Sequence, residues 1–293
     1  MGRCMFAAVA GQHDVMSALG PNTLYARDLG RALAGAALFA LPLFMTMEMW
    51  AFGFTMDRGR LLVMLIAAMP ILVGLSYFAG FERAFGLVDH VLDTFAAIAV
   101  AAFSALCVLM LFGVLQWGAP VGEVAGKVAV LTLPGAIGAL LAHKQLDDDE
   151  SAADAKARSY FAKLFLMAIG AIFIAFNVAP TEEMILIAHQ ISPWQAIGIA
   201  LISLAALHAL LFLAELPGRA ERRGDDSFFS VFIRYSLAGY GICAAVCAGM
   251  LWCFGRLDGV SIFEASEFVI VLGFPAALGA GAAQFLIGEK RGA

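Results

Sequence analysis

The sequence predicts an all-α protein, a polytopic bundle of transmembrane helices. Hydrophobic residues make up 62% of the 293 residues and charged residues only 14%, and the mean hydropathy is +0.89. A soluble domain of this size has too little interior to hide so much apolar side chain. The apolar residues also form blocks of about 20 without a charge, the length that spans a bilayer core. This composition excludes a soluble enzyme, a nucleic-acid binder and a disordered chain.

These blocks predict eight spans, each a helix, because a helix satisfies its own backbone groups in lipid. The sixth block is the least regular. Pro193 separates a short apolar piece, Met184–Ile191, from a full span that begins at Trp194, and we expect the short piece to be re-entrant or interfacial. The predicted spans are residues 30–54, 60–80, 92–117, 124–143, 160–179, 184–214, 229–254 and 266–287.

The placement of basic residues predicts the orientation, whereas the net charge of −5 says little about partners. Fourteen of the 18 Lys and Arg residues fall on the side that holds both termini and the loops after spans 2, 4 and 6. Basic loops stay in the cytoplasm, so both termini are predicted to be cytoplasmic. The five cysteines form no CxxC pair and four lie in apolar runs, which favours packing over a disulfide or zinc site.

Two segments in the second part of the chain resemble two segments in the first part, at nearly equal spacings. EVAGKVAVLTLPGAIGALLA at residues 123–142 and EASEFVIVLGFPAALGAGAA at residues 264–283 share nine of twenty positions at an offset of 141. TME at Thr46–Glu48 and TEE at Thr181–Glu183 match at an offset of 135. Chance similarity between low-complexity apolar segments is the alternative explanation.

We therefore predict a tandem duplication of a four-helix unit, in residues 30–146 and 158–293. An even number of helices gives both copies the same orientation, so a pseudo-twofold axis should run along the membrane normal. A cytoplasmic tail, residues 1–29, precedes the first unit, and an acidic cytoplasmic linker, residues 147–157, joins the two.

Three motifs resemble a family of bacterial integral membrane proteins of unknown function. They are LPLFMTMEMW at Leu41–Trp50, NVAPTEE at Asn177–Glu183 and VLGFPAALGA at Val271–Ala280. The resemblance covers about residues 25–290 and implies a multi-pass protein of the bacterial inner membrane. It implies no activity, cofactor or catalytic residue.

Carboxylates gather at the extracytoplasmic ends of the predicted spans and outnumber the bases there. Such a ring concentrates cations, and charge near a bilayer is costly unless it has a pathway or a partner. Hydrated or paired interfacial carboxylates are the structural alternative. The predicted ion-pathway residues are Glu48, Glu182, Glu183, Glu123 and Glu264.

Two prolines fall near the middle of the last helix of each unit. Pro134 and Pro275 should each free a carbonyl and kink the helix, and paired interruptions indicate a transport site. Small residues beside them, including Gly138 and Gly279, allow close approach of another backbone. The alternative is tight packing of the two last helices against each other across the pseudo-axis.

His208 is the one histidine in the middle of a predicted span, and Glu215 lies seven residues further on. The pair could form a proton relay, and the alternative is a histidine bonded to a neighbouring helix. No catalytic motif is present, so we expect no enzyme activity and no cofactor. The sequence does not identify a metal site.

The leading hypothesis is a cation or proton channel or transporter with acidic residues at its extracytoplasmic mouth. Its partners are then the lipid bilayer and an inorganic cation or proton, in a monomer or a homo-oligomer, with no nucleic acid. The first alternative is a non-catalytic accessory subunit of a membrane assembly. The second is an intramembrane enzyme, which needs a convergent acid, base or metal set that the sequence does not offer.

Overall fold

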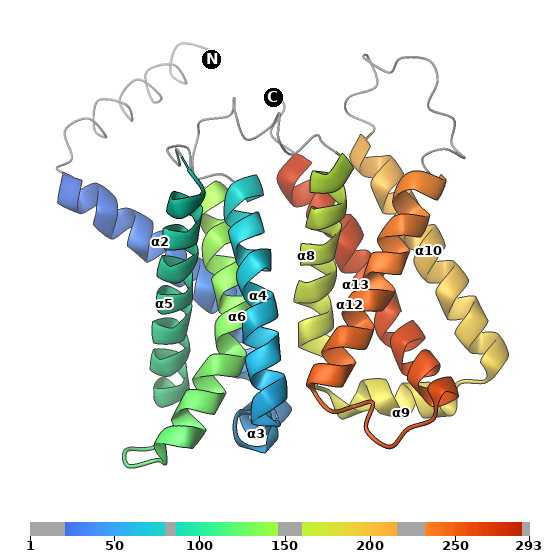
Figure 1. Cartoon of the computed structure of the whole chain (residues 1–293), viewed down its shortest axis with the longest axis horizontal. Coiled ribbons are helices and arrows are strands. Elements are labelled where there is room, and N and C mark those ends of the chain that lie inside the picture. The colour runs from blue at the N-terminus through green and yellow to red at the C-terminus, as the bar shows by residue number, and fades with distance from the viewer. Residues whose placement is uncertain (1–20, 80–85, 146–159, 216–231, 289–293) are drawn as a thin grey trace, which may run out of the picture.

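The computed structural model describes residues 21–79, 86–145, 160–215 and 232–288, and all regular structure within these ranges is helical (Figure 1). The predicted helical membrane bundle is thereby confirmed. Seven segments are long and apolar enough to cross a membrane, and a bent helix pair is an eighth candidate. The N-terminal tail before residue 21 and the acidic run of the linker lie outside the described residues.

The helices form two groups that lie side by side (Figure 1). We call residues 21–145 the first half and residues 160–288 the second half. The first half contains α2 (Pro21–Phe44), α3 (Met47–Thr55), α4 (Arg58–Ala79), α5 (Leu87–Leu111) and α6 (Val121–Gln145). The second half contains α8 (Tyr160–Val178), α9 (Glu182–Gln190), α10 (Pro193–Glu215), the π-helix η2 (Phe232–Leu237) running into α12 (Ala238–Cys253), and α13 (Ile262–Gly288).

The first predicted span, residues 30–54, is wrong as a single straight helix, because α2 and α3 meet at an angle of 91°. Thr46 has an extended backbone (φ −98°, ψ 117°) and is the N-cap of α3. Its hydroxyl donates to the carbonyl of Pro42 at 2.7 Å, and the indole of Trp50 donates to the carbonyl of Phe44 at 2.8 Å. These bonds satisfy carbonyls that the end of α2 leaves free, so the bend is stable in an apolar region.

The predicted break in the sixth region is confirmed, since the short helix α9 ends at Gln190 and α10 begins at Pro193. Proline is favoured in the first turn of a helix, where its missing N–H has no intrahelical partner. Thr181 precedes α9 with an extended backbone (φ −74°, ψ 147°) and donates to the carbonyl of Val178 at 2.8 Å. Thr46 and Thr181, 135 residues apart, therefore both stand immediately before a short helix.

Each half is organised around its last helix. In the first half α6 contacts α2, α3, α4 and α5, and in the second α13 contacts α8, α9, α10 and α12. A methyl group added at Gly35 of α2 would lie 2.6 Å from the carbonyl oxygen of Gly138, and one added at Gly279 would lie 2.5 Å from that of Gly170 in α8. The small residues thus pack each last helix against the first helix of its own half. The alternative of packing α6 on α13 through these glycines is wrong.

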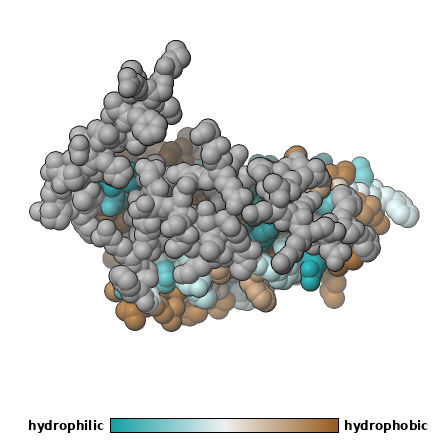
Figure 2. Space-filling model, turned by 90° about the horizontal axis from the view of Figure 1, so that it is seen from above, coloured by the Kyte–Doolittle hydropathy of each residue, from teal (hydrophilic) through white to brown (hydrophobic). Residues whose placement is uncertain are grey.

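The outer surfaces of the bundle suit a bilayer. Large apolar side chains are exposed along α4, α5 and α10, among them Leu62, Phe95 and Leu201. In Figure 2 much of the described surface visible around the sides is hydrophobic, with smaller hydrophilic patches between. Contacts between the halves are sparse and involve mainly α4 with α8 and α12, and α6 with α8.

Candidate functional site

The short helices α3 and α9 lie at the same end of the bundle, opposite the end at which α2 begins and α13 finishes (Figure 1). We call this end the α3–α9 face. The predicted acidic residues all fall in the first turn of a helix, where a negative charge interacts favourably with the helix dipole. They are Glu48 of α3, Glu182 and Glu183 of α9, Glu123 of α6 and Glu264 of α13.

Glu123 is an ion-pair partner. Its Oε1 lies 2.5 Å from Lys127 Nζ, which also donates to the carbonyl of Val114 at 3.3 Å and lies 5.8 Å from the ring centroid of Phe54. Lys127 is only 5% exposed, and the backbone of Gly53 packs directly against it. The Glu123 carboxylate therefore compensates the buried Lys127 ammonium. This agrees with the alternative of a paired interfacial carboxylate.

Glu264 caps its own helix. Its carboxylate accepts a hydrogen bond from the Ser261 amide at 2.8 Å, and the Glu264 amide donates to the Ser261 hydroxyl at 3.2 Å. This reciprocal pair is a capping box, and the Ser-x-x-Glu spacing that encodes it is visible in the sequence. The sequence analysis read Glu264 for its charge and missed this signal.

Glu48 and Glu183 occupy the second position of α3 and α9, respectively. Glu48 is partly exposed and Glu182 and Glu183 are exposed. Among the described residues no hydrogen bond or ion pair joins any of the five predicted carboxylates to another. The structure thus brings them to one face but does not pair them.

Glu267 belongs to the carboxylates expected at this end of the spans, but it is not one of the five predicted ion-pathway residues. It lies one turn into α13, is 8% exposed, and makes no hydrogen bond or ion pair within the described part of the chain. The residue 141 positions earlier is Gly126, so Glu267 has no acidic counterpart at this offset. Within the described ranges no group of three or more His, Cys, Asp or Glu side chains is arranged to hold a metal.

The two halves are joined at the α3–α9 face by six side chains that we call the clasp: Phe52 and Arg60 of the first half, and Trp252, Phe254, Arg256 and Asp258 of the second. Arg60 donates two hydrogen bonds of 2.7 Å to the carboxylate of Asp258 and lies 5.3 Å from the ring centroid of Trp252. The guanidinium holds the pKa of the Asp258 carboxyl below its usual range.

Aromatic contacts complete the clasp. The rings of Phe52 and Phe254 are 5.0 Å apart, and Arg256 lies 5.4 Å from the ring centroid of Phe52. Arg256 also donates to the carbonyl of Pro180, the residue just before the Thr181 cap. Arg256 thereby connects the break between α8 and α9 to α3 of the other half.

Pro134 and Pro275 lie inside α6 and α13, and both helices continue past them. The carbonyls that they deprive of an intrahelical partner belong to Val130 and Val271, one turn earlier, and both residues are buried. These positions lie within the central helix of each half.

His208 bonds to a neighbouring helix, as the alternative for it proposed. Its Nδ1 is 2.8 Å from the Ser236 hydroxyl of η2, and both residues are buried. The first half contains a similar contact, with His90 Nδ1 of α5 at 3.1 Å from the Ser76 hydroxyl of α4. The side chain of Glu215 lies outside the described part, so the relay between His208 and Glu215 stays a prediction.

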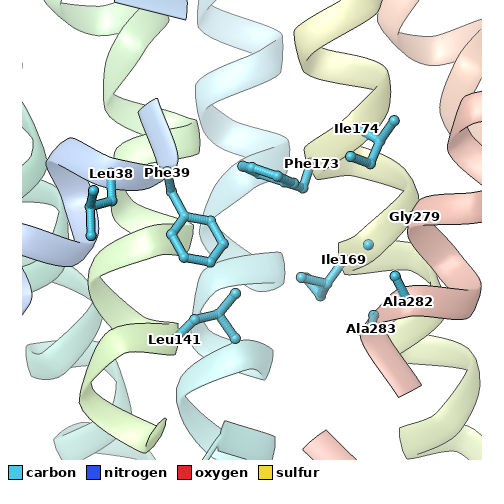
Figure 3. A pocket seen from close by; sticks show the side chains of 10 residues that line it. Leu38, Phe39, Leu141, Ile169, Phe173, Ile174, Gly279, Ala282 and Ala283 are labelled. Carbon is cyan, nitrogen blue, oxygen red and sulfur yellow. The ribbon is translucent and has the colours of Figure 1, made fainter. Parts of the chain in front are cut away.

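A crevice of about 350 Å³ lies between the halves, with walls from α2, α6, α8 and α13 (Figure 3). Its lining residues are all apolar or glycine. Three residues of the first half and three of the second correspond at the offsets found in the sequence: Leu38 and Phe173, Phe39 and Ile174 at 135, and Leu141 and Ala282 at 141.

Comparison with known proteins gives one result. The family model described as "Putative integral membrane protein (DUF2391)" matches residues 28–287. No curated protein and no solved structure matches the chain. The match confirms the resemblance inferred from the three sequence motifs and spans nearly all of the described helices. The chain therefore belongs to the DUF2391 family of integral membrane proteins.

Proposed function

We propose that this protein is a membrane carrier built from two duplicated halves, which moves a proton or another cation across the bilayer. The weak interface between the halves supports a carrier over a fixed pore. The halves share few contacts, and their bidentate ion pair lies at the α3–α9 face. An open apolar crevice lies between α2, α6, α8 and α13, and Phe78 of α4 packs on Phe165 of α8 toward the other end. Two related halves with a weak mutual interface can rock about a shared axis and expose a site to each side in turn.

The duplication itself is part of this proposal. It is supported by the matching order of long and short helices and by the paired glycine contacts, Gly35 with Gly138 and Gly170 with Gly279. The first members of these pairs are 135 residues apart and the second members 141, the same offsets as in the sequence match.

The carboxylates of the α3–α9 face supply the proposed cation preference. Glu123 and Glu264 have structural partners, so the proposal rests mainly on Glu48 and Glu183, which stand at corresponding positions of the two short helices. Neither carboxylate forms an ion pair within the described residues, and solvent-accessible carboxylates of this kind attract cations to a surface. Glu267 lies deeper on the same side of the second half and is a candidate next step.

Flux measurements in proteoliposomes test the cation proposal. Purified protein should carry protons or alkali cations, and Glu48→Gln or Glu183→Gln should slow the flux several-fold while the folded protein still inserts. Gln190→Ala, an exposed change at the end of α9, is the control and should leave the flux unaltered. Absence of flux in the unmodified protein would favour the accessory-subunit alternative.

Cross-linking of the clasp separates a carrier from a channel. Arg60→Cys combined with Asp258→Cys, in a background without other cysteines, can be bridged by a bifunctional thiol reagent. A carrier whose halves must separate at this face stops when the bridge forms and recovers when the reagent is cleaved. Undiminished flux through the bridged protein would contradict the carrier proposal and favour a channel.

The membrane orientation is also proposed, with both termini in the cytoplasm of a bacterial inner membrane. The basic residues near the two ends support it. Reporter fusions after Ala293 should be active in the cytoplasm, and fusions near Asp57 or Asp258 should report the outside. An outside report at Ala293 would overturn the orientation.

A further inference from the structure

We propose that Glu267 of α13 binds the ion that this protein moves, and that the ion is a proton. The inference rests on the proposed carrier function and narrows the transported cation to one. It is supported by the burial of Glu267, by the partners of the groups around it, and by the oxygen ligands available at its position.

Glu267 lies in an apolar helix where that helix packs on α9. It is 8% exposed and belongs to the segment Ile262–Gln284, which is long and apolar enough to cross a membrane. The next residue, Phe268, is 1% exposed, and its ring centroid lies 5.3 Å from that of His189 of α9. In Figure 1 α9 lies beside the first turns of α13. Glu267 is therefore largely withdrawn from water.

The charged groups nearest to Glu267 in the chain have partners of their own. Glu264 accepts a hydrogen bond from the Ser261 amide, and Arg256 donates to the carbonyl of Pro180. No hydrogen bond or ion pair within the described ranges joins Glu267 to a titratable group of the helices around α13. These groups are Glu182, Glu183 and His189 of α9, Lys163 of α8, His208 of α10, and Tyr240 and the cysteines of α12.

An enclosed carboxylate without a partner is costly. The cost is removed when the carboxylate binds a cation or a proton. Glu267 is thus suited to bind a positively charged ion and to release it when the site opens to water.

The ligands at this position suit a proton. Metal cations bind several oxygen atoms at once, whereas a proton binds a single carboxylate oxygen. The backbone of α13 is helical on both sides of Glu267, so its carbonyls are bonded within the helix. The hydroxyl of the preceding residue, Ser266, donates to the carbonyl of Phe263. The Glu267 carboxyl is therefore the oxygen ligand that this part of α13 offers.

Glu264 gives a second reason for a proton. It precedes Glu267 by three residues, so the two side chains leave the same side of the helix, about 5–6 Å apart at Cβ. The hydrogen bond from the Ser261 amide favours the ionised form of the Glu264 carboxylate. A proton on Glu267 removes the repulsion between two like charges and leaves the capping box intact.

The proposed site belongs to the second half alone. The residue 141 positions earlier is Gly126, and a methyl group added there would overlap the carbonyl oxygen of Gly53. The first half instead buries the Lys127 ammonium beside Glu123. We therefore expect a single proton-binding carboxyl in each chain.

Labelling of the full chain in liposomes with dicyclohexylcarbodiimide tests the site. This apolar reagent reacts with a protonated carboxyl group. The proton moves to a carbodiimide nitrogen, the carboxylate oxygen bonds to the central carbon, and rearrangement gives a stable acylurea without a leaving group. Peptide mass spectrometry should find about tenfold more label on Glu267 than on the exposed Glu182 and Glu183, because water solvates the charged form of those two.

The labelling should fall as the pH rises and should be unaffected by Na⁺ or K⁺ at constant pH. Asp57→Asn, which removes an exposed acid of the first half, is the control and should leave the label on Glu267 unchanged. Protection by either metal cation would overturn the assignment of a proton. Equal labelling of Glu267 and the exposed acids, or no label on Glu267 at any pH, would overturn the site.

Proton flux in proteoliposomes connects the site to transport. Glu267→Gln should lower the flux at least about tenfold, and Glu267→Asp, which keeps a carboxyl group, should retain part of the flux and of the labelling. Proton flux that survives Glu267→Gln would overturn this inference and leave the carrier proposal standing. If the unmodified protein moves no ion, the carrier proposal fails, and the labelling still decides whether Glu267 binds a proton.

Discussion

The two halves of the molecule share their packing but not their polar chemistry. In both, a central helix contacts four others, and a pair of glycines brings it against the first helix of the half. Around α3, however, the first half places Gly53 against the backbone of Lys127, whereas the residues 135 and 141 positions later are Ala188 and Phe268. The comparison shows that close packing of helix backbones at glycines fixes the helix arrangement, while the side chains nearby can differ between the halves.

Buried charge shows the same divergence. The first half buries the Lys127 ammonium and pairs it with Glu123, and the second half buries the Glu267 carboxylate without an ion-pair partner among the described residues. Each half also joins its second and third long helices through a buried Ser–His contact. The histidine lies on the later helix in the first half, as His90, and on the earlier helix in the second, as His208.

The largest expected effect comes from the glycine contacts. Gly138→Ala and Gly279→Ala should each lower the free energy of unfolding by roughly 1–3 kcal/mol, because the new methyl group meets a facing backbone carbonyl. Thermal unfolding in detergent measures the loss. Gly198→Ala in α10, where a methyl group meets nothing within 4 Å, is the control and should cost nothing. Equal losses would support matched halves, and a loss at only one position would break the comparison.

The buried charges should respond differently in the two halves. Glu123→Gln leaves the Lys127 ammonium buried without its counter-ion and should cost about 1–3 kcal/mol. Lys127→Met should cost less, since the partly exposed carboxylate that remains can be hydrated. In the second half Glu267→Gln removes a buried charge and should not destabilise the fold. The same unfolding assay compares the three, and a large loss for Glu267→Gln would show an unrecognised partner.

The two Ser–His contacts should contribute similarly to the free energy of unfolding. Ser76→Ala and Ser236→Ala each remove one buried hydrogen bond and should lower the free energy of unfolding by about 1 kcal/mol. Ser266→Ala, an exposed serine whose hydroxyl bonds only within its own helix, is the control. A difference of more than twofold between the two buried sites would indicate that the exchanged positions of the histidine matter energetically.

Loss of the Arg60–Asp258 ion pair should have the smallest effect on stability, because Asp258 is exposed and water screens the interaction. The pKa of Asp258 is lowered in the folded protein. The ion pair therefore stabilises the fold fully above the ordinary aspartate pKa of about 3.9. This stabilisation disappears as the pH falls through the lowered pKa of Asp258 in the folded protein. The stability of the unmodified protein and that of Asp258→Asn should converge as the pH is lowered. A constant difference down to low pH would exclude this carboxylate as the cause.

Part of the candidate site could be predicted from the sequence. The short helix before Pro193 was predicted because proline separates it from the next span. The position of the acidic residues at one end of the spans followed from the boundaries of the apolar segments that lack charged residues. Their partners could not be predicted. Glu123 and Lys127 lie one helical turn apart, yet the burial of the ammonium depends on α3 crossing above it.

Composition and spacing by themselves determined that the chain is a helical membrane protein, because lipid leaves a helix as the natural way to satisfy an apolar backbone. The offsets of 135 and 141 residues between similar segments are likewise read from the amino-acid sequence alone. Only the tertiary structure decided the 91° bend after Phe44, since Pro42, the proline in this apolar run, lies inside α2 and the helix continues past it. It alone decided the clasp and the crevice, because Arg60 and Asp258, or Phe39 and Phe173, meet through the packing of two halves far apart in the chain.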